Sequence, residues 1–366
     1  MRRSPIHDQL AARGAEFEEQ AGVERALRFS TYSGEYRAVR EGVGITDFSF
    51  ATRYKVPEEG LDVFERYAAG NVANIRFGRV LHTLAADSDG MIESDLYVAN
   101  DDEEIFLIGE NLVEDEKVSA VLRELGGEEA GLVDLTSETV LLGIDGFNAW
   151  AVAKELFGTD VLGLPYLSIE TYDLDGCDIK LIRAGKTSEF GYLLMAPNDA
   201  AGHLLESIEK AGEVYDIKHI GLDAHLGLRL DGRFFNIHSE GREVRDPLAL
   251  GLQWMIDFEE EEFRGREAIL ERRAAGPEKK IIGIQPLDTG DSLEKGDQIV
   301  HQHQVVAKVV SAADSPLLGT RVGLALFDWQ YAYSGLEYER TKGGGIKTIS
   351  MPPFTAKSLT VRLDEM

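Results

Sequence analysis

One order of predicted elements occurs twice along the chain, and this constrains its fold more than any other feature. Residues 50–130 read as strand, helix, three strands and helix, with a hairpin between strands at 80–86 and 91–99. A second passage of similar plan opens with an apolar strand at 139–144 and closes with a helix at 199–211. Short strands among amphipathic helices favour two α+β modules with antiparallel sheets over a parallel doubly wound sheet.

From about Lys279 the pattern changes. Short strands rich in β-branched residues are predicted at 281–284, 298–300, 304–310, 321–326 and 359–363, with turn residues between them. This pattern indicates a small all-β barrel or sandwich, joined to the rest by a linker at 274–278. Two further helices are predicted from helical spacing and glycine stops, at 5–22 and 33–41, and the helix that closes the 50–130 passage is predicted at 110–125.

The charge balance excludes several classes of function. The 366 residues include 65 acidic and 38 basic side chains, a net charge of -27, which argues against a general nucleic-acid binder and against adhesion to anionic lipid. A single cysteine, Cys177, excludes an internal disulfide and a cysteine-based zinc site. No apolar run is long enough for a signal peptide or a spanning helix, so we expect a cytoplasmic location without membrane contact. The acidic run at 259–262 is expected to be a solvated turn.

The common catalytic motifs are absent. Gly185-Lys186-Thr187 ends like a phosphate loop, but the glycine required five residues earlier is Lys180. No glycine fingerprint opens a dinucleotide fold, and no His-Glu-x-x-His metal motif occurs. His301 and His303 flank one residue in the β-rich part and are read as solvent-facing, so no metal site is predicted.

The hairpin strand at 91–99 carries the most unusual residues. Glu93 and Asp95 are two apart in a strand, so their side chains point to the same face. Strand interiors disfavour aspartate, and Asp95 stands between Ile92 and Leu96. It is either a solvated strand-end residue or a pocket carboxylate that orients an amine or ether oxygen and exchanges a proton.

A series of stretches along nearly the whole chain forms a recognisable order. They are Ser4-Pro5-Ile6-His7-Asp8, Glu35–Ser49, Asp89–Leu96, Leu141–Gly146, Gly185–Tyr192, Gly221–Gly232, Asp246–Trp254, Phe263–Ala268 and Ser311–Leu326. In this order they resemble the aminomethyltransferase (T-protein) family of the glycine cleavage system and its folate-dependent relatives, with one residue inserted in Asp89–Leu96. Each fragment is weak alone, and their common order carries the resemblance.

The resemblance implies a three-domain, ring-like α+β protein: two ferredoxin-like modules and a C-terminal all-β barrel around a channel for tetrahydrofolate. The expected boundaries are 1–50 with 134–275, 51–133, and 276–366. It also implies one-carbon transfer to folate from a small-molecule methyl or aminomethyl donor, with a carrier protein as a further partner if the chain is a true glycine-cleavage component. The family's catalytic aspartate maps to Asp95.

The chain departs from the family at the pterin site. Family members hold the pterin with a glutamate after Gly-Tyr and an arginine that opens the next helix, and these positions read Leu193 and His225 here. The charge-assisted pair is therefore missing, and Glu189 and Arg229 are candidates to replace it. The family's Val-Ser-His-Met also reads Phe48-Ser49-Phe50-Ala51. We therefore expect a divergent, demethylase-type paralogue.

The segment Arg233-Phe234-Phe235-Asn236-Ile237-His238 replaces the family's Gly-Met-Asn-Leu-Tyr-Gly and suggests a reshaped pocket wall. His238 is a second candidate catalytic residue, as an acid–base group. Aromatic residues that line a donor pocket, or simply pack in the core, are Tyr32, Tyr97, Phe234, Phe235 and Trp254. The residues expected to contact tetrahydrofolate are Glu189, Tyr192, His225, Arg229, Tyr97 and Trp254.

Two alternatives remain open. One is an enzyme of the same fold that acts on another ligand without folate. The other is a non-catalytic folate-binding accessory protein, although the cysteine motif of such relatives is absent near 235–243.

For an anionic folate tail, we expect a locally basic mouth formed by Arg229, Arg233, Arg242 and Arg245 within the acidic surface.

Overall fold

The computed structural model describes residues 1–102, 104–259 and 262–363. Glu260 and Glu261, half of the acidic run, lie outside the described residues. Within the described part, no helix is long and apolar enough to cross a membrane.

The first module is assembled from two separate stretches of chain. The N-terminal stretch forms α1 (His7–Ala12), β1 (Glu16–Gln20), β2 (Val23–Arg28), α2 (Tyr32–Glu41) and β3 (Gly44–Asp47). The later stretch forms β9 (Thr139–Asp145), α5 (Ala149–Phe157), β10 (Ser168–Leu174), β11 (Cys177–Arg183), β12 (Gly191–Pro197), α6 (Ala201–Gly212) and β13 (Lys218–His219). The intervening chain builds the second module.

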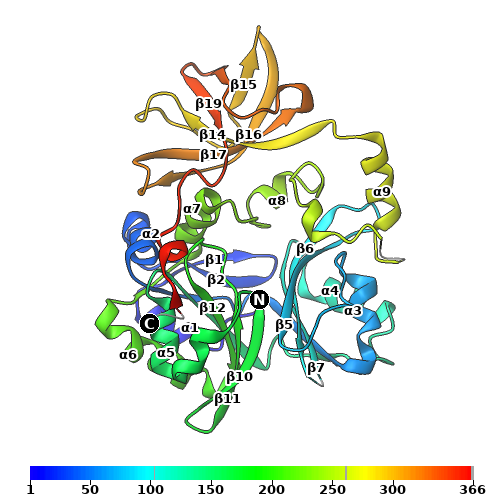
Figure 1. Cartoon of the computed structure of the whole chain (residues 1–366), viewed down its shortest axis with the longest axis vertical. Coiled ribbons are helices and arrows are strands. Elements are labelled where there is room, and N and C mark those ends of the chain that lie inside the picture. The colour runs from blue at the N-terminus through cyan, green and yellow to red at the C-terminus, as the bar shows by residue number, and fades with distance from the viewer. Residues whose placement is uncertain (103, 260–261, 364–366) are drawn as a thin grey trace.

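The second module consists of β4 (Thr52–Pro57), α3 (Asp62–Tyr67), β5 (Arg79–Ala86), β6 (Ile92–Asp101), β7 (Glu104–Asn111), α4 (Asp115–Glu124) and β8 (Val133–Asp134). Its sheet continues that of the first module, because β10 pairs with β5 through Ser168 and Arg79. The result is one 11-stranded sheet in the order β13-β3-β9-β12-β11-β10-β5-β6-β7-β4-β8. Figure 1 shows the two modules side by side, with α5 and α6 on one flank and α3 and α4 on the other.

Because side chains alternate along each strand, the two faces of this sheet pack into separate hydrophobic clusters. In β12, Tyr192 and Leu194 pack under the helices, whereas Leu193 and Met195 join a central cluster. Strands β5, β6, β7 and β9 contribute their opposite faces to the same central cluster. The faces turned away from the helices therefore meet in the middle of the molecule, and this is where the candidate site lies.

A third layer closes the molecule. The connecting helices α7 (Leu222–Gly232), α8 (Glu240–Glu243) and α9 (Arg266–Ala275) lead to β14 (Lys279–Pro286), β15 (Gln298–His301), β16 (Gln304–Ser315), β17 (Thr320–Asp328), β18 (Glu337–Arg340) and β19 (Gly345–Ile349). The last six strands form a closed antiparallel barrel in the order β14-β17-β16-β15-β18-β19. The predicted α+β fold with a C-terminal barrel is thereby confirmed.

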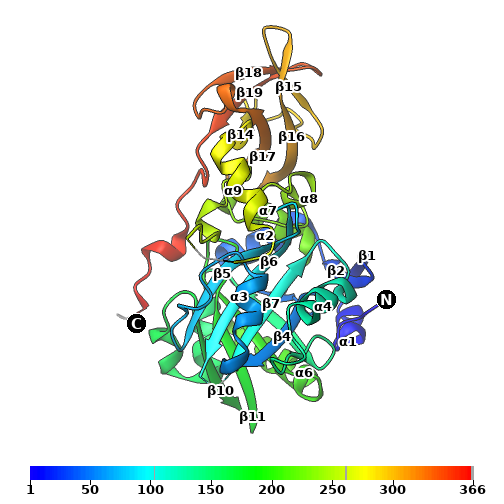
Figure 2. The same ribbon diagram turned by 90° about the vertical axis from the view of Figure 1, so that its right-hand side faces the viewer.

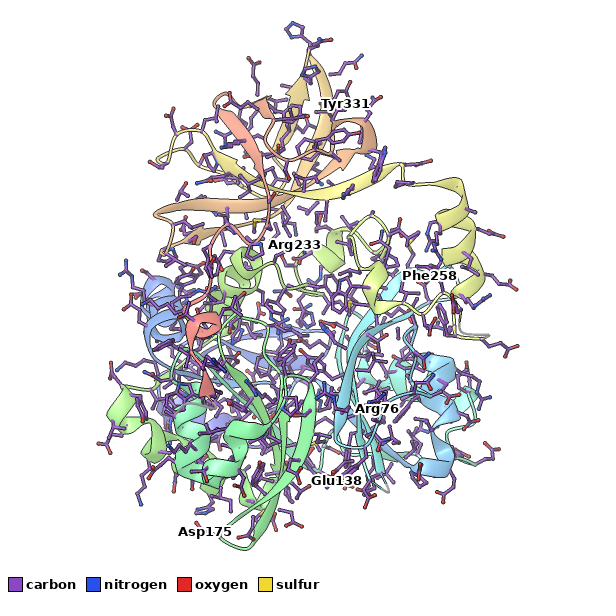
Figure 3. All side chains as sticks on the ribbon, viewed as in Figure 1. Arg76, Glu138, Asp175, Arg233, Phe258 and Tyr331 are labelled. Atoms are coloured by element: carbon purple, nitrogen blue, oxygen red, sulfur yellow. The ribbon has the colours of Figure 1, made fainter. Side chains whose placement is uncertain are left out.

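Figure 2 shows the chain after the barrel running back along the outside to the first module. Side chains fill the layer between the barrel and the modules, where Arg233 lies (Figure 3). There Arg233 donates a hydrogen bond to the carbonyl of Leu250 at 3.0 Å.

Three local predictions are wrong. The helix predicted at 5–22 is only α1, followed by the β1–β2 hairpin, since Ala21 and Gly22 adopt positive φ angles that make a turn. The helix predicted from Glu110 begins at Asp115, and Glu110 belongs to β7. The strand predicted at 359–363 is absent, and the short helical turn Lys357–Thr360 lies there instead.

Candidate functional site

Strand alternation brings four distant polar residues to the centre of the molecule. Asp95 and Tyr97 lie on the inner face of β6, Glu110 on that of β7, and Asp145 at the end of β9. Lys186 and Arg229 join them from the loop before β12 and from α7. All six line one cavity, together with apolar residues such as Phe48, Leu141 and Leu193.

Asp95 is completely buried and has a cationic or hydrogen-bonding partner on each carboxylate oxygen. Its Oδ1 lies 2.7 Å from His82 Nε2, and its Oδ2 accepts a hydrogen bond from Lys186 Nζ at 2.5 Å. Burial alone would raise the pKa of this carboxyl, but Lys186 and His82 outweigh burial and hold the pKa below its ordinary value. Asp95 is therefore an ionised carboxylate at neutral pH.

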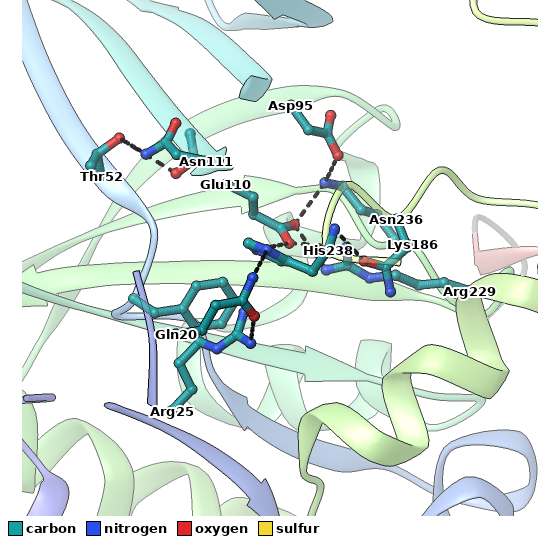
Figure 4. A network of polar contacts seen from close by, with 12 residues as sticks. Gln20, Arg25, Thr52, Asp95, Glu110, Asn111, Lys186, Arg229, Asn236 and His238 are labelled. Atoms are coloured by element: carbon teal, nitrogen blue, oxygen red, sulfur yellow. Dashed lines mark hydrogen bonds and ion pairs between the residues drawn. The ribbon is translucent and has the colours of Figure 1, made fainter. Parts of the chain in front are cut away.

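Glu110 completes a balanced cluster of four charges. Arg229 donates to both of its carboxylate oxygens, at 2.8 and 3.0 Å, and Lys186 donates at 2.8 Å. Against the effect of burial, Arg229 and Lys186 hold the pKa of Glu110 well below its ordinary value. Figure 4 shows the resulting chain of contacts from Asp95 through Lys186 and Glu110 to Arg229.

The cavity is narrow and adjoins a larger one. The cavity at Asp95 has a volume of about 30 Å³, and its neighbour one of about 660 Å³. Gly185 lines both cavities, and His82, the partner of Asp95, lines the larger one. Phe234, Phe235, Trp254 and Arg233 also line the larger cavity.

His225 lies in the cavity wall as a neutral side chain. Its Nε2 lies 2.7 Å from the Thr46 hydroxyl, its Nδ1 has no hydrogen-bond partner among the described residues, and its ring meets Phe48 edge-on. Burial and the nearby Arg229 lower its pKa to about 3. His225 therefore offers the cavity a hydrogen-bonding nitrogen and no positive charge.

His238 is not adjacent to Asp95. Its Nδ1 lies 3.3 Å from the Gln20 amide nitrogen, and its Nε2 lies 3.7 Å from Glu110. Burial outweighs the attraction of Glu110 and lowers the pKa of His238 to about 3, so the ring is neutral. The structure thus places this predicted acid–base residue behind Glu110, with no direct contact to Asp95.

The other predicted contact residues lie in three different surroundings. Tyr97 lines the cavity, and its hydroxyl has no partner among the described residues. Trp254 is 64% exposed at the larger cavity, edge-on to His82. Glu189 also borders the larger cavity, but its carboxylate pairs with Arg40 at 3.2 Å and bonds Ser358. Tyr192 packs in the core under the helices, on the other face of β12.

The four arginines expected at a basic mouth are not brought together. Arg229 is buried against Glu110, and Arg233 borders the larger cavity. Arg242 is exposed, and Arg245 pairs with Asp87 at 2.7 Å beside a third cavity. The four arginines therefore lie in different surroundings.

Sequence reasoning missed four residues of the site: His82, Glu110, Asp145 and Lys186. Glu110 was hidden by the wrong helix prediction, although the apolar run 105–108 could have extended a strand to it. Lys186 and Asp145 lie in the stretches Gly185–Tyr192 and Leu141–Gly146 that resemble the family, but nothing in the sequence marked either one as a site residue. Among the described residues, no cluster of three His, Cys, Asp or Glu side chains is arranged to hold a metal ion.

Comparisons with known proteins agree with this architecture. The crystal structure of glycine cleavage system aminomethyltransferase T from Bartonella henselae superposes with a TM-score of 0.83 over 97% of this chain and 98% of that one, at 20% identity. The aminomethyltransferase of Bacillus subtilis is 27% identical over 90% of this chain and 91% of its own length. The probable aminomethyltransferase of Thermococcus gammatolerans is 29% identical over 97% of both chains.

The family model described as the GCVT N-terminal domain matches residues 6–260. This range contains both sheet modules and every residue of the cavity around Asp95. The chain therefore belongs to the GCVT family, the family of the glycine cleavage T-protein.

Proposed function

We propose that this protein is a tetrahydrofolate-dependent one-carbon transferase, and that it is a demethylase-type paralogue rather than a glycine-cleavage protein. The observation that carries the proposal is Asp95, a fully buried carboxylate kept ionised by Lys186 and His82 in the central cavity. Family membership supports the general reaction. The changed residues Leu193 and His225 in the same cavity support a different donor.

The lining residues suit a flat heterocycle with both donors and acceptors. Tyr97 Oη and His225 Nδ1 are buried polar atoms without a partner among the described residues, and Asp145 adds a carboxylate. Phe48, Leu141 and Leu193 supply apolar walls. The room beside Asp95 is too small for a bicyclic ring in this arrangement of side chains, so ring entry requires the cavity lining to widen.

Bound tetrahydrofolate supplies the amine nitrogen that accepts the one-carbon group. The chain's own contribution is positioning and charge, since transfer between two bound partners is mostly a matter of near-attack geometry. Asp95 orients the acceptor or stabilises positive charge that develops next to it in a cavity without bulk water. His82 and Lys186 hold that carboxylate in place, and His82 reaches the larger cavity where a donor fits.

The larger cavity suits a small methylated donor. It is bordered by Phe234, Phe235 and Trp254, and aromatic faces stabilise the cationic methyl donors of amine or sulfonium type. A glycine-cleavage protein would instead be expected to take an aminomethyl group from a carrier protein. This donor is the alternative to a small methylated molecule. The enzyme without folate is the second candidate, favoured by the loss of a charged pair at Leu193 and His225.

Calorimetric titration of the purified protein with tetrahydrofolate tests the proposal. We expect saturable binding, and transfer from methylamine, methyl-ether or sulfonium donors detected as methylated folate. Asp95→Asn should lower turnover by about 100-fold or more while leaving the fold intact. Absence of binding at millimolar tetrahydrofolate contradicts the folate proposal and favours the folate-free enzyme. Full activity of Asp95→Asn contradicts the role of Asp95.

A further inference from the structure

Asp145 is a buried carboxylate to which the proposed transfer step assigns no specific role. Its side chain lines the central cavity, and the residue is 3% exposed. The Thr187 hydroxyl, at 3.2 Å from Oδ1, is its one side-chain hydrogen-bond donor among the described residues, and within that part of the chain it forms no ion pair. A buried carboxylate with so few partners is costly, so a missing partner is expected.

The backbone around Asp145 is built to hold its carboxylate. A Cβ atom at Gly185 or at Gly191 would lie 2.8 Å from Oδ1, closer than real Cβ atoms approach. Glycine at both positions therefore leaves the space that Oδ1 occupies. The other oxygen, Oδ2, lies toward Gly143, where a Cβ would be 3.5 Å away.

Gly143 is the residue directly opposite Leu193 in the β9–β12 pair. Because Asp145 is two residues further along β9, it projects to the same face as Gly143, diagonal to Leu193. Strand β9 thus places the carboxylate of Asp145 beside Leu193 of β12, whose own side chain is apolar. Both side chains line the same cavity.

We propose that Asp145 is the residue that recognises the ligand's ring edge: its ionised carboxylate accepts hydrogen bonds from adjacent N–H groups, such as the amino-pyrimidinone edge of a reduced pterin. This inference rests on the proposed function and adds a specificity residue to it. A carboxylate facing two N–H groups forms paired charge-assisted bonds.

The proposal has a measurable pH signature. Burial raises the pKa of Asp145 to about 7, partly offset by the Thr187 hydrogen bond. The charged or titratable groups that face it are Arg229 and His225 on α7, Arg40 on α2, Tyr166 before β10, and Asp95, Glu110 and Lys186 across the cavity. N–H donors bind only the ionised form, so affinity should rise with pH until about one unit above this pKa.

The test measures tetrahydrofolate affinity by calorimetry at pH 6, 7 and 8 for the wild type and Asp145→Asn. For the wild type we expect about tenfold weaker binding at pH 6 than at pH 8, because about a tenth of the carboxyl is ionised at pH 6. Asp145→Asn should bind at least tenfold more weakly at pH 8 and lose this pH dependence. Any pH dependence that arises from other groups persists in the variant, so the difference between the two proteins isolates Asp145.

Two further measurements keep the outcome clear. Binding at pH 6.5 should release a proton from the wild type, detected in buffers of different ionisation enthalpy, but not from Asp145→Asn. Asp178→Asn, an exposed change of equal charge on β11, serves as the matched control and should bind like the wild type. Asp145→Asn should fold, which thermal unfolding verifies, because its amide leaves no charge to bury.

The outcomes separate the two proposals. Wild-type binding that is unchanged in Asp145→Asn, or that weakens as the pH rises, overturns the role of Asp145 and leaves the folate proposal standing. No tetrahydrofolate binding by the wild type overturns both.

Discussion

Lys186 decides the charge state of the site at the scale of single residues. Its ammonium group is 7% exposed and bridges Asp95 and Glu110, so each carboxylate shares it while keeping a second partner, His82 or Arg229. Without that positive charge, the desolvation of two buried carboxylates at one place would favour their protonated forms. Lys186 is thus a positioning residue that keeps Asp95 ionised.

Lys186→Met should destabilise the protein by about 3 kcal/mol at pH 7, since breaking a buried ion pair leaves charge uncompensated. The pKa values of Asp95 and Glu110 are depressed in the folded state, so their contribution to stability is present above pH 4 and is lost as the pH falls through the folded pKa values. The deficit of the variant should therefore be largest at neutral pH and shrink below about pH 4.

Thermal unfolding between pH 3 and 8 checks this expectation. Lys55→Met is the matched control, because Lys55 pairs with Glu104 at a partly exposed site, and its loss should cost less than about 1 kcal/mol. A Lys186→Met deficit that does not change with pH would contradict the proposed electrostatic role.

At the scale of elements, the β1–β2 hairpin shows why local sequence misled the prediction. Helical spacing of apolar residues at 5–22 is real, but only α1 uses it, and the hairpin instead buries Val23 and Ala26 against the sheet module. Gln20 and Arg25 of this hairpin reach the site, where Gln20 contacts His238. Tertiary packing overrides propensity here, as it does for Glu110 at the end of β7.

The chain crosses between the two modules twice, and one buried arginine bonds to both crossing segments. Arg53 in β4 is 1% exposed and donates to Ser49 and Ala51 carbonyls at one crossing and to Thr136 and Thr139 at the other. Burial lowers its pKa to about 10. Its planar group serves five acceptors at once, which a lysine cannot do.

Arg53→Lys should therefore lower the free energy of unfolding by about 3 kcal/mol, because buried carbonyl groups lose their donors. Chemical denaturation measures this, with Arg76→Lys at an exposed position as the control, expected within about 0.5 kcal/mol of the wild type. Equal stability of the two variants would show that Arg53 does not join the modules.

At the scale of the whole molecule, Asp231 links three parts of the chain. Tyr36 and Arg40 of α2 and Ser315 of the barrel all donate to its carboxylate, with Arg40 at 2.6 Å and Ser315 at 3.0 Å. Arg40 continues to Glu189, which holds the C-terminal segment through Ser358. One buried network thus connects the first module, the barrel and the returning tail.

Asp231→Asn should destabilise the protein by about 3 kcal/mol, because Arg40 remains buried with one carboxylate fewer. Limited proteolysis should then cut earlier near 276–278, where the barrel joins α9. Asp314→Asn at the surface of β16 is the control, since its pairing with Arg321 is largely exposed. Unchanged proteolysis and stability in Asp231→Asn would rule out this link.

The sequence by itself determined the class of the fold and the family. The hairpin at 79–101 and four barrel strands were predictable because their signals are local. These signals are the alternation of apolar and polar residues, the turn residues, and the succession of short strands after Lys279. The strands β18 and β19 were not predicted, because their exposed charges hide the alternation. Asp95 was found because an aspartate inside an apolar strand contradicts local propensity.

Only the tertiary structure decided which residues accompany Asp95. His82, Glu110, Asp145 and Lys186 come from four separate elements, up to 104 positions apart from first to last, and no local pattern relates them. The folded sheet brings their inner faces together and removes water, so opposite charges pair and pKa values shift. Contact in space depends on strand order and not on distance along the chain, so the sequence could not show which of these residues meet.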